Sequence, residues 1–266
     1  MQDLSNPVLW RAQNGVGHIV LNRPDAANAI DLAMAEAFGQ AVAHLANADI
    51  GAVLISANGR QFCAGGDIRT FHAELGRLDQ LVRDLLDILH PALQRLVELP
   101  VPVITAIQGS VGGAGIGLAL CADIALASEA MKLRGGYSAL GLSPDLGASY
   151  FLARRAGAAR AKSILMTNRA LSAAECLGFG LVDELHPAST LTSAAERLAM
   201  DLAAGATGAL GGIKRLCDRA TRLTLVEHLG DERRALLRCA QSADGREGVR
   251  AFAEKRAAVF SDPRID

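Results

Sequence analysis

The chain has 266 residues, half of them hydrophobic, so it is long enough to bury a sizeable core. Its net charge of −1 at pH 7 provides no overall field for nucleic acid or an anionic membrane, so neither is expected as a partner. A soluble cytoplasmic protein without a metal site or disulfide framework is expected, because the five cysteines form no CxxC pair and no stretch has the pattern of a membrane span or a secretion signal.

The first part of the chain alternates between strand and helix patterns. Residues 8–22 read as a β-hairpin, with Asn14 and Gly15 as its turn. Asp31 is expected to cap an alanine-rich amphipathic helix. Residues 51–56 then predict a short buried strand.

The middle of the chain continues this alternation. Residues 78–99 carry apolar side chains at helical spacing, and the helix is expected to be interrupted at Pro91. Residues 101–107 and 123–127 predict two further strands, separated by a glycine-rich turn and a short helix. Recurring strand, turn and helix are typical of an α/β fold with parallel strands.

The pattern changes near residue 188, after which helical spacing continues to residue 260. We therefore divide the chain into a core at residues 1–190 and a helical C-terminal subdomain at residues 191–266. No internal repeat or low-complexity tract indicates a further boundary.

Two turns are built from residues with almost no side chain, at 62–67 (FCAGGD) and at 109–117 (GSVGGAGIG). Small residues let the backbone approach a ligand and adopt unusual dihedral angles. Two such turns side by side could hold one carbonyl oxygen between two backbone N–H groups and stabilise negative charge on it. The alternative is that they are tight turns needed only for packing, since one glycine-rich turn alone is weak evidence.

Five separated segments carry a resemblance to a known family: they are 22–29 (NRPDAANA), 62–68 (FCAGGDI), 107–115 (IQGSVGGAG), 171–182 (LSAAECLGFGLV) and 247–256 (EGVRAFAEKR). In this order they resemble the enoyl-CoA hydratase/isomerase (crotonase) superfamily. The resemblance covers essentially the whole chain and implies a crotonase-like spiral of ββα units with a helical C-terminal trimerisation region. It also implies an acyl-CoA thioester as the substrate, with coenzyme A as part of that substrate and no separate cofactor.

By position, the resemblance implies that the backbone amides of Gly66 and Ala114 are the oxyanion donors. It also implies a homotrimer or a dimer of trimers, in which Lys255 contacts the coenzyme A phosphate bound to a neighbouring subunit. The remaining candidates for binding coenzyme A are Arg23, Ala26, Ala64, Gly65, Asp67, Ile68 and Gly113.

Two glutamates that share a catalytic water in hydratases of this family are missing. The first would stand at Gly117 and the second, by spacing, at Tyr137. Adding water to a double bond needs one group to activate the water and one to deliver a proton, so ordinary hydratase chemistry is not favoured.

Asp145 is the acid that remains. It lies between Pro144 and the helix expected from Gly147, so it could simply cap that helix. In the superfamily, however, this position points into the acyl pocket, and residues 144–152 (PDLGASYFL) look most like ring-opening or double-bond isomerases of the phenylacetyl-CoA type. We therefore expect Asp145 to be the acid/base of an acyl-CoA isomerase.

Other readings stay open. His90 and Asp145 resemble the pair of 4-chlorobenzoyl-CoA dehalogenase, so a dehalogenase or thioester hydrolase with an Asp145 nucleophile and a His90 base is the alternative. His90 could instead have no catalytic role and be a partly exposed side chain at the helix break before Pro91. An enoyl-CoA hydratase and a catalytically silent paralogue that binds acyl-CoA or RNA complete the set.

Overall fold

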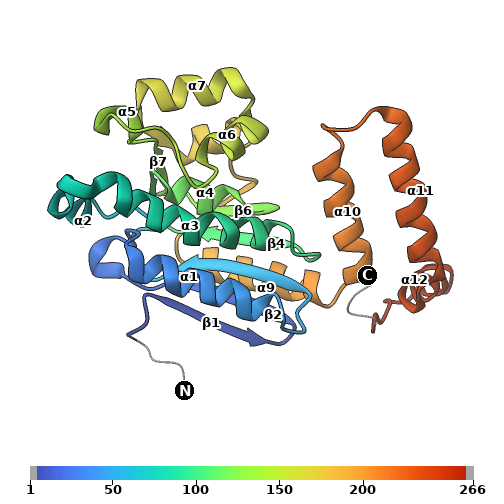
Figure 1. Ribbon diagram of the computed structural model, residues 1–266. Helices are drawn as coiled ribbons and strands as arrows, with labels where there is room; N and C mark the ends of the chain where they lie inside the picture. Colours follow the sequence, from blue (N-terminus) through green and yellow to red (C-terminus); the bar gives the residue numbers. More distant parts are fainter. Residues whose placement is uncertain (1–4, 262–266) are drawn as a thin grey trace.

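The computed structural model describes residues 5–261, so residues 1–4 and 262–266 at the ends of the two expected segments lie outside it. Two β-sheets form the centre of the molecule (Figure 1). In the six-stranded sheet every neighbouring pair is parallel except the first, in the order β1 (Val8–Gln13), β2 (Val16–Leu21), β3 (Ala52–Ala57), β4 (Val103–Ile107), β6 (Ile124–Ser128) and β9 (Glu184–His186). The three-stranded sheet has the order β5 (Ser110–Gly112), β7 (Lys132–Arg134) and β8 (Leu171–Ser172).

The helices connect these strands and then continue alone at the C-terminal end, which confirms the expected α/β class with a helical C-terminal region. They are α1 (Leu32–Leu45), α2 (Ile68–Ala73), α3 (Leu78–Val97), α4 (Gly115–Leu120), α5 (Tyr137–Leu140), α6 (Ala148–Ala156), α7 (Ala158–Thr167), α8 (Ala173–Gly178), α9 (Leu191–Ala203), α10 (Thr207–Arg219), α11 (Leu225–Gln241) and α12 (Ala243–Ala253). In the described part of the chain, none of them is long and apolar enough to cross a membrane.

The expected hairpin and the first helix are both confirmed. Gln13 pairs with Val16, which leaves Asn14 and Gly15 as a two-residue turn with φ angles of 54° and 74°. The Asp31 side chain accepts a hydrogen bond from the backbone N–H of Met34 and so caps α1.

The expected break at Pro91 is wrong, because α3 continues through it from Leu78 to Val97. Pro91 lies on the exposed face of the helix, whereas Leu89, Leu93 and Leu96 are buried on the other. The burial of this apolar face holds the helix together where proline removes one backbone hydrogen bond.

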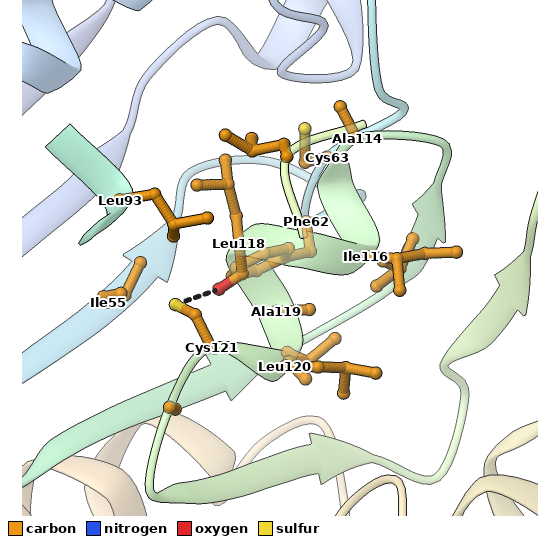
Figure 2. Packing of buried hydrophobic residues seen from close by; sticks show 14 of the residues in the cluster. Ile55, Phe62, Cys63, Leu93, Ala114, Ile116, Leu118, Ala119, Leu120 and Cys121 are labelled. Atoms are coloured by element: carbon orange, nitrogen blue, oxygen red, sulfur yellow. Dashed lines mark hydrogen bonds between the residues drawn. The ribbon is translucent and has the colours of Figure 1, made fainter. Parts of the chain in front are cut away.

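Alternate residues of the strands face two separate apolar clusters. Ile55 of β3 belongs to the larger cluster, which includes residues of α1, α3 and α4, while its neighbour Leu54 belongs to the smaller one with α9. Figure 2 shows the larger cluster around α4, where Phe62 and Leu118 pack and the Cys121 thiol donates to the Leu118 carbonyl at 3.3 Å. The strands therefore carry helices on both faces.

Helices α10, α11 and α12 extend away from the sheets as an arm (Figure 1). The expected division of the chain at residue 190 stays a prediction. Within residues 191–261, α9 packs on the sheet and only the later helices form the arm.

The arm is fixed to the core through α10. The buried ammonium of Lys214 lies 2.9 Å from the Asp123 carboxylate and donates to the Val101 carbonyl at 3.1 Å. A Cβ atom on Gly211 would stand 2.2 Å from the carbonyl oxygen of Pro100, so glycine lets the two backbones meet. An ion pair made by a buried lysine and a backbone contact therefore set the direction of α10.

Lys214→Ala is expected to lower the free energy of unfolding by about 2–3 kcal/mol. It leaves the Asp123 carboxylate, whose pKa burial already raises, without its cation. Chemical denaturation followed by circular dichroism measures this, with the exposed Lys162→Ala as the control. Equal stability of the two variants would contradict the anchoring role.

Candidate active site

The two glycine-rich turns lie against each other at one edge of the large sheet. They follow β3 and β4, which are parallel neighbours, so their carboxyl ends meet at the same edge. The backbone amide of Gly112 donates to the Cys63 carbonyl at 2.9 Å, and that of Phe62 donates to the Ser110 carbonyl at 3.1 Å. These bonds join segments that are far apart in the sequence.

The contact between the turns leaves no room for side chains. A Cβ atom on Gly65, whose φ is 94°, would lie 2.8 Å from the Gly112 carbonyl oxygen and 3.2 Å from the backbone nitrogen of Ala114. The glycines at 65 and 112 are therefore needed for the approach of the two backbones.

Among the amides of these turns for which the described residues provide no backbone acceptor are those of Gly66 and Ala114. Their neighbours are satisfied: Asp67 donates to the Ile30 carbonyl at 2.9 Å, and Gly113 donates to the Gly135 carbonyl at 3.1 Å. Buried N–H groups normally find a partner, so a pair of unpaired amides in adjacent turns suits a ligand oxygen.

Asp145 does not cap the following helix. The cap of α6 is Gly147, with φ of 73° and no side-chain hydrogen bond. The Asp145 carboxylate instead accepts a hydrogen bond of 2.5 Å from the hydroxyl of Tyr137, which is 7% exposed at the start of α5. The structure thus joins two residues that the sequence analysis had singled out separately.

Opposing effects act on the Asp145 carboxyl. Burial raises its pKa above the ordinary aspartate value, while the Tyr137 hydrogen bond and the nearby His90 charge act in the lowering direction. The pKa of the Cys63 thiol is raised to about 12, chiefly by burial and also by the negative charge of Asp145. The carboxylate is therefore close enough to the first glycine-rich turn to act on it electrostatically.

The turn that carries Asp145 packs directly on α4. A Cβ atom on Gly117 would stand 1.8 Å from the carbonyl oxygen of Leu146 and 2.8 Å from its carbonyl carbon. Leu146 itself has a φ of 43°, which is uncommon for a residue with a side chain. Gly117 therefore makes room for the backbone next to Asp145.

Arg23 lies in an ion-pair cluster. Its guanidinium is 2.9 Å from the Asp31 carboxylate and 3.2 Å from that of Asp67, and it also donates to the Ala29 carbonyl. Asp67 caps α2 by accepting from the amide of Arg69 at 3.1 Å. Through Arg23, the segment at residues 23–31 is therefore tied to Asp67 at the end of the first glycine-rich turn.

The other candidates for coenzyme A binding are distributed over two parts of the molecule. Ala64 and Ile68 are exposed beside the first turn, Gly65 is buried, and Ala26 and Gly113 are half-buried. Lys255 is exposed just after α12, which lies at the opposite end of the molecule from α2 and α5 (Figure 1). Within one chain the structure does not bring Lys255 to the other candidates.

The sequence analysis did not single out Asn28 or Leu146, which support the two turns of the site. Asn28 is fully buried, donates to the carbonyls of Asn58 and Gln61 at 2.9 and 2.8 Å, and accepts from the amide of Arg23 at 2.7 Å. Its signal was present in the NRPDAANA segment, where a polar side chain stands among alanines. The role of Leu146 had no such signal, because it depends on its backbone conformation.

Comparison with known proteins gives the family. The family model described as enoyl-CoA hydratase/isomerase matches residues 11–263. The chain is 35% identical to the 1,2-epoxyphenylacetyl-CoA isomerase of Escherichia coli, over 96% of this chain and 98% of that protein. It is 30% identical to the trans-2-decenoyl-[acyl-carrier-protein] isomerase of Streptococcus mutans, over 96% of this chain and 97% of that protein.

Solved structures agree with the sequence matches. The crystal structure of an enoyl-CoA hydratase from Polaromonas sp. JS666 superposes with a TM-score of 0.90 at 32% identity, covering 96% of this chain and 99% of that one. Matching proteins thus include isomerases and a hydratase. The chain belongs to the enoyl-CoA hydratase/isomerase (crotonase) superfamily, a family of enzymes that act on acyl-CoA thioesters.

Proposed function

We propose that the protein is an acyl-CoA isomerase that shifts a double bond or rearranges its acyl group through a thioester enolate. Asp145 is its single acid/base, and the amides of Gly66 and Ala114 bind the thioester oxygen. The observation that carries the proposal is a half-buried carboxylate, held by Tyr137, next to two turns with unpaired amides.

The reaction needs one proton-carrying group. A C–H bond of the acyl chain breaks, its proton goes to the Asp145 carboxylate, and its electron pair moves towards the thioester oxygen to form an enolate. The two amides stabilise the charge that develops there. Asp145 then returns the proton to a different carbon, so no atom is gained or lost. The raised pKa of Asp145 makes it a better base than an exposed aspartate.

The surroundings of Gly117 argue against a hydratase. A glutamate at this position would need a Cβ atom where the Leu146 carbonyl oxygen lies. Tyr137, which stands where hydratases of the family have their second glutamate, donates a hydrogen bond to Asp145. The site therefore offers one carboxylate where water addition uses two groups. The 35% identity to the 1,2-epoxyphenylacetyl-CoA isomerase likewise supports an isomerase rather than a hydratase.

A nucleophilic reaction is the second candidate. His90 of α3 is exposed and near enough for its charge to act on Asp145, as a water-activating base beside a nucleophilic aspartate would be. In that reaction Asp145 attacks the substrate carbon and displaces a halide or thiolate. A silent acyl-CoA binder is less well supported, because it needs no partly buried carboxylate beside the unpaired amides.

We further propose that three copies assemble, alone or as a dimer of trimers, through the arm. Several apolar side chains on it are exposed by more than two thirds, and apolar patches of this kind mark interfaces. Assembly would also allow Lys255 to contact coenzyme A phosphate on a neighbouring subunit, since the helix just before it, α12, lies at the opposite end of the molecule from α2 and α5. The exposed side chains are Leu225, Val226 and Leu236 of α11 and Val249 and Phe252 of α12.

Asp145→Asn is expected to lower kcat for isomerisation by about 10²–10⁴-fold, because it removes the base but keeps the size of the side chain. Stability at neutral pH is expected to stay equal or rise, because a carboxyl with a raised folded-state pKa destabilises the fold while it is ionised. A panel of 3-enoyl, 2-enoyl, epoxyphenylacetyl and 4-chlorobenzoyl thioesters of coenzyme A measures the turnover. Full isomerase activity in this variant would refute the proposed base.

His90→Gln separates the two mechanisms. An isomerase should keep its kcat within a few-fold, since the imidazole takes no part in moving the proton. A nucleophilic enzyme should instead stop after the covalent step, with an acyl or aryl adduct on Asp145 that mass spectrometry detects.

Gly117→Ala is expected to displace the Leu146 carbonyl, and with it Asp145, and so to reduce both stability and isomerase activity. The loss of stability should exceed about 2 kcal/mol, as for other overpacked sites. Gly178→Ala in α8 is the matched control, because its new Cβ atom would meet nothing within 4 Å. Thermal unfolding and steady-state rates test both variants; unchanged activity in Gly117→Ala would contradict the packing argument.

Light scattering at micromolar concentration is expected to give the mass of a trimer or hexamer. Phe252→Asp on the arm, where the side chain is 88% exposed, should shift the protein towards smaller species. Met166→Asp in α7 removes a side chain that is 72% exposed outside the arm and should leave the mass unchanged. A monomeric wild-type protein would disprove the assembly and the role of Lys255.

A further inference from the structure

We propose that Tyr137 is a positioning residue for Asp145: its hydroxyl holds Oδ1 so that Oδ2 alone takes and returns the substrate proton. The inference rests on the proposed function, in which Asp145 is the acid/base. Tyr137 itself contacts the carboxylate and acts through it.

The geometry of the pair is well defined. The Tyr137 hydroxyl donates to Oδ1 of Asp145 at 2.5 Å, and the ring is buried, with 7% of the residue exposed. A distance of 2.5 Å is typical of a strong O–H···O⁻ hydrogen bond to an ionised carboxylate. Because the ring is enclosed, the hydroxyl has little freedom to leave its acceptor.

The backbone on both sides of Tyr137 is also held in place. The Gly136 amide donates to the Asn168 side-chain oxygen at 2.7 Å, and the Leu142 amide donates to the Tyr137 carbonyl at 3.1 Å. Gly136 has a φ of 82°, a conformation that favours glycine at this point. The start of α5 is thereby fixed relative to β7 and α7, and the hydroxyl reaches Asp145 from a rigid support.

Hydrogen-bond chemistry decides which carboxylate oxygen reacts. A phenol has one hydrogen to donate, and here it is directed at Oδ1. If the substrate proton went to Oδ1, this oxygen would become the hydroxyl of the acid, a weaker acceptor than a carbonyl oxygen, and the bond from Tyr137 would weaken. If it goes to Oδ2, then Oδ1 becomes the carbonyl oxygen of the acid and still accepts from Tyr137. The bond is therefore best preserved through the cycle when Oδ2 carries the proton.

Tyr137 stays a donor throughout this cycle. Burial, followed by the negative charge of Asp145, raises the pKa of its hydroxyl well above the usual tyrosine value, so the phenol does not ionise. Its bond to a charged carboxylate is also stronger than its bond to a neutral acid. Tyr137 thus favours the ionised base and offsets part of the burial that favours the acid.

Tyr137→Phe tests this role. The acid limb of the kcat/KM profile should move to higher pH, because the lowering effect of the hydrogen bond on the pKa of Asp145 is gone. On the plateau kcat should fall about tenfold, which corresponds to roughly 1.4 kcal/mol, while KM stays within about twofold. Tyr150→Phe is the matched control, since Tyr150 is the other tyrosine and its exposed hydroxyl faces Arg154 and Arg222. An unmoved acid limb in Tyr137→Phe would overturn the proposal.

Titration of the Asp145 carboxyl gives a readout that needs no turnover. Infrared difference spectra between each protein and its Asp145→Asn form isolate this carboxyl, which should titrate at higher pH in Tyr137→Phe than in the wild type. An unchanged titration rejects the role of Tyr137 whatever the reaction is. A shifted titration together with full isomerase activity in Asp145→Asn confirms the pair and rejects the proposed function, so the two failures are distinct.

Replacing Tyr137 with fluorotyrosine perturbs its hydrogen bond to Asp145 in the opposite direction without removing the ring. In the Tyr150→Phe background the analogue is incorporated at position 137 alone, because the chain has two tyrosines. The more acidic hydroxyl of the analogue donates more strongly, so the acid limb should move to lower pH than in that background with ordinary tyrosine. This variant keeps the shape of Tyr137 and so covers the case in which Tyr137→Phe does not fold. A limb that does not move would count against the proposal.

Discussion

Close approach of backbone atoms around α4 is the constraint on which the site depends. A Cβ atom on Gly115 would lie 2.5 Å from the Cys63 carbonyl oxygen, and one on Gly117 would lie 1.8 Å from the Leu146 carbonyl oxygen. One glycine thus admits the first glycine-rich turn and the other admits the turn that carries Asp145. Glycine inside a helix costs about 0.5–1 kcal/mol relative to alanine. The short helix α4 carries this cost, and in return two loops from distant parts of the chain meet at one place.

Asp145 illustrates how burial and hydrogen bonding act together on the proposed base. Burial raises the pKa and favours the protonated acid, which cannot take a proton, whereas full hydration would leave a weaker base. The structure combines burial with one strong donor, Tyr137, and a more distant charge, His90. Because the folded-state pKa remains raised, the ionised carboxyl lowers stability at pH values above it. That penalty disappears as the pH falls below the unfolded-state value, so the site is least favourable to the fold in the ionised state that the proposed reaction requires.

The elements that could be predicted from the sequence are those decided by neighbouring residues. The Asn14–Gly15 turn and the Asp31 cap each depend on a few adjacent positions, and both were found as expected. Pro91 was misjudged because its local effect is overruled by the burial of the opposite helix face. The bond between Tyr137 and Asp145 could not be predicted, although both residues had been noticed. It spans eight positions, and Asp145 stands directly before Leu146, whose positive φ nothing in a leucine indicates.

The chemistry and the proposed assembly are carried by separate parts of the chain. The turns and Asp145 pack against the larger apolar cluster, and α9 closes the opposite face of the sheet. The arm leaves this body after α9 and is fixed by Lys214, whose partner Asp123 stands directly before β6. A shift at Asp123 would act on β6, the neighbour of β4, from which the second glycine-rich turn emerges. A second link is direct: Asp218 of α10 lies 3.3 Å from Arg154, and Arg222 donates to the Tyr150 hydroxyl at 2.6 Å. Arg154 and Tyr150 both belong to α6, the helix that follows Asp145.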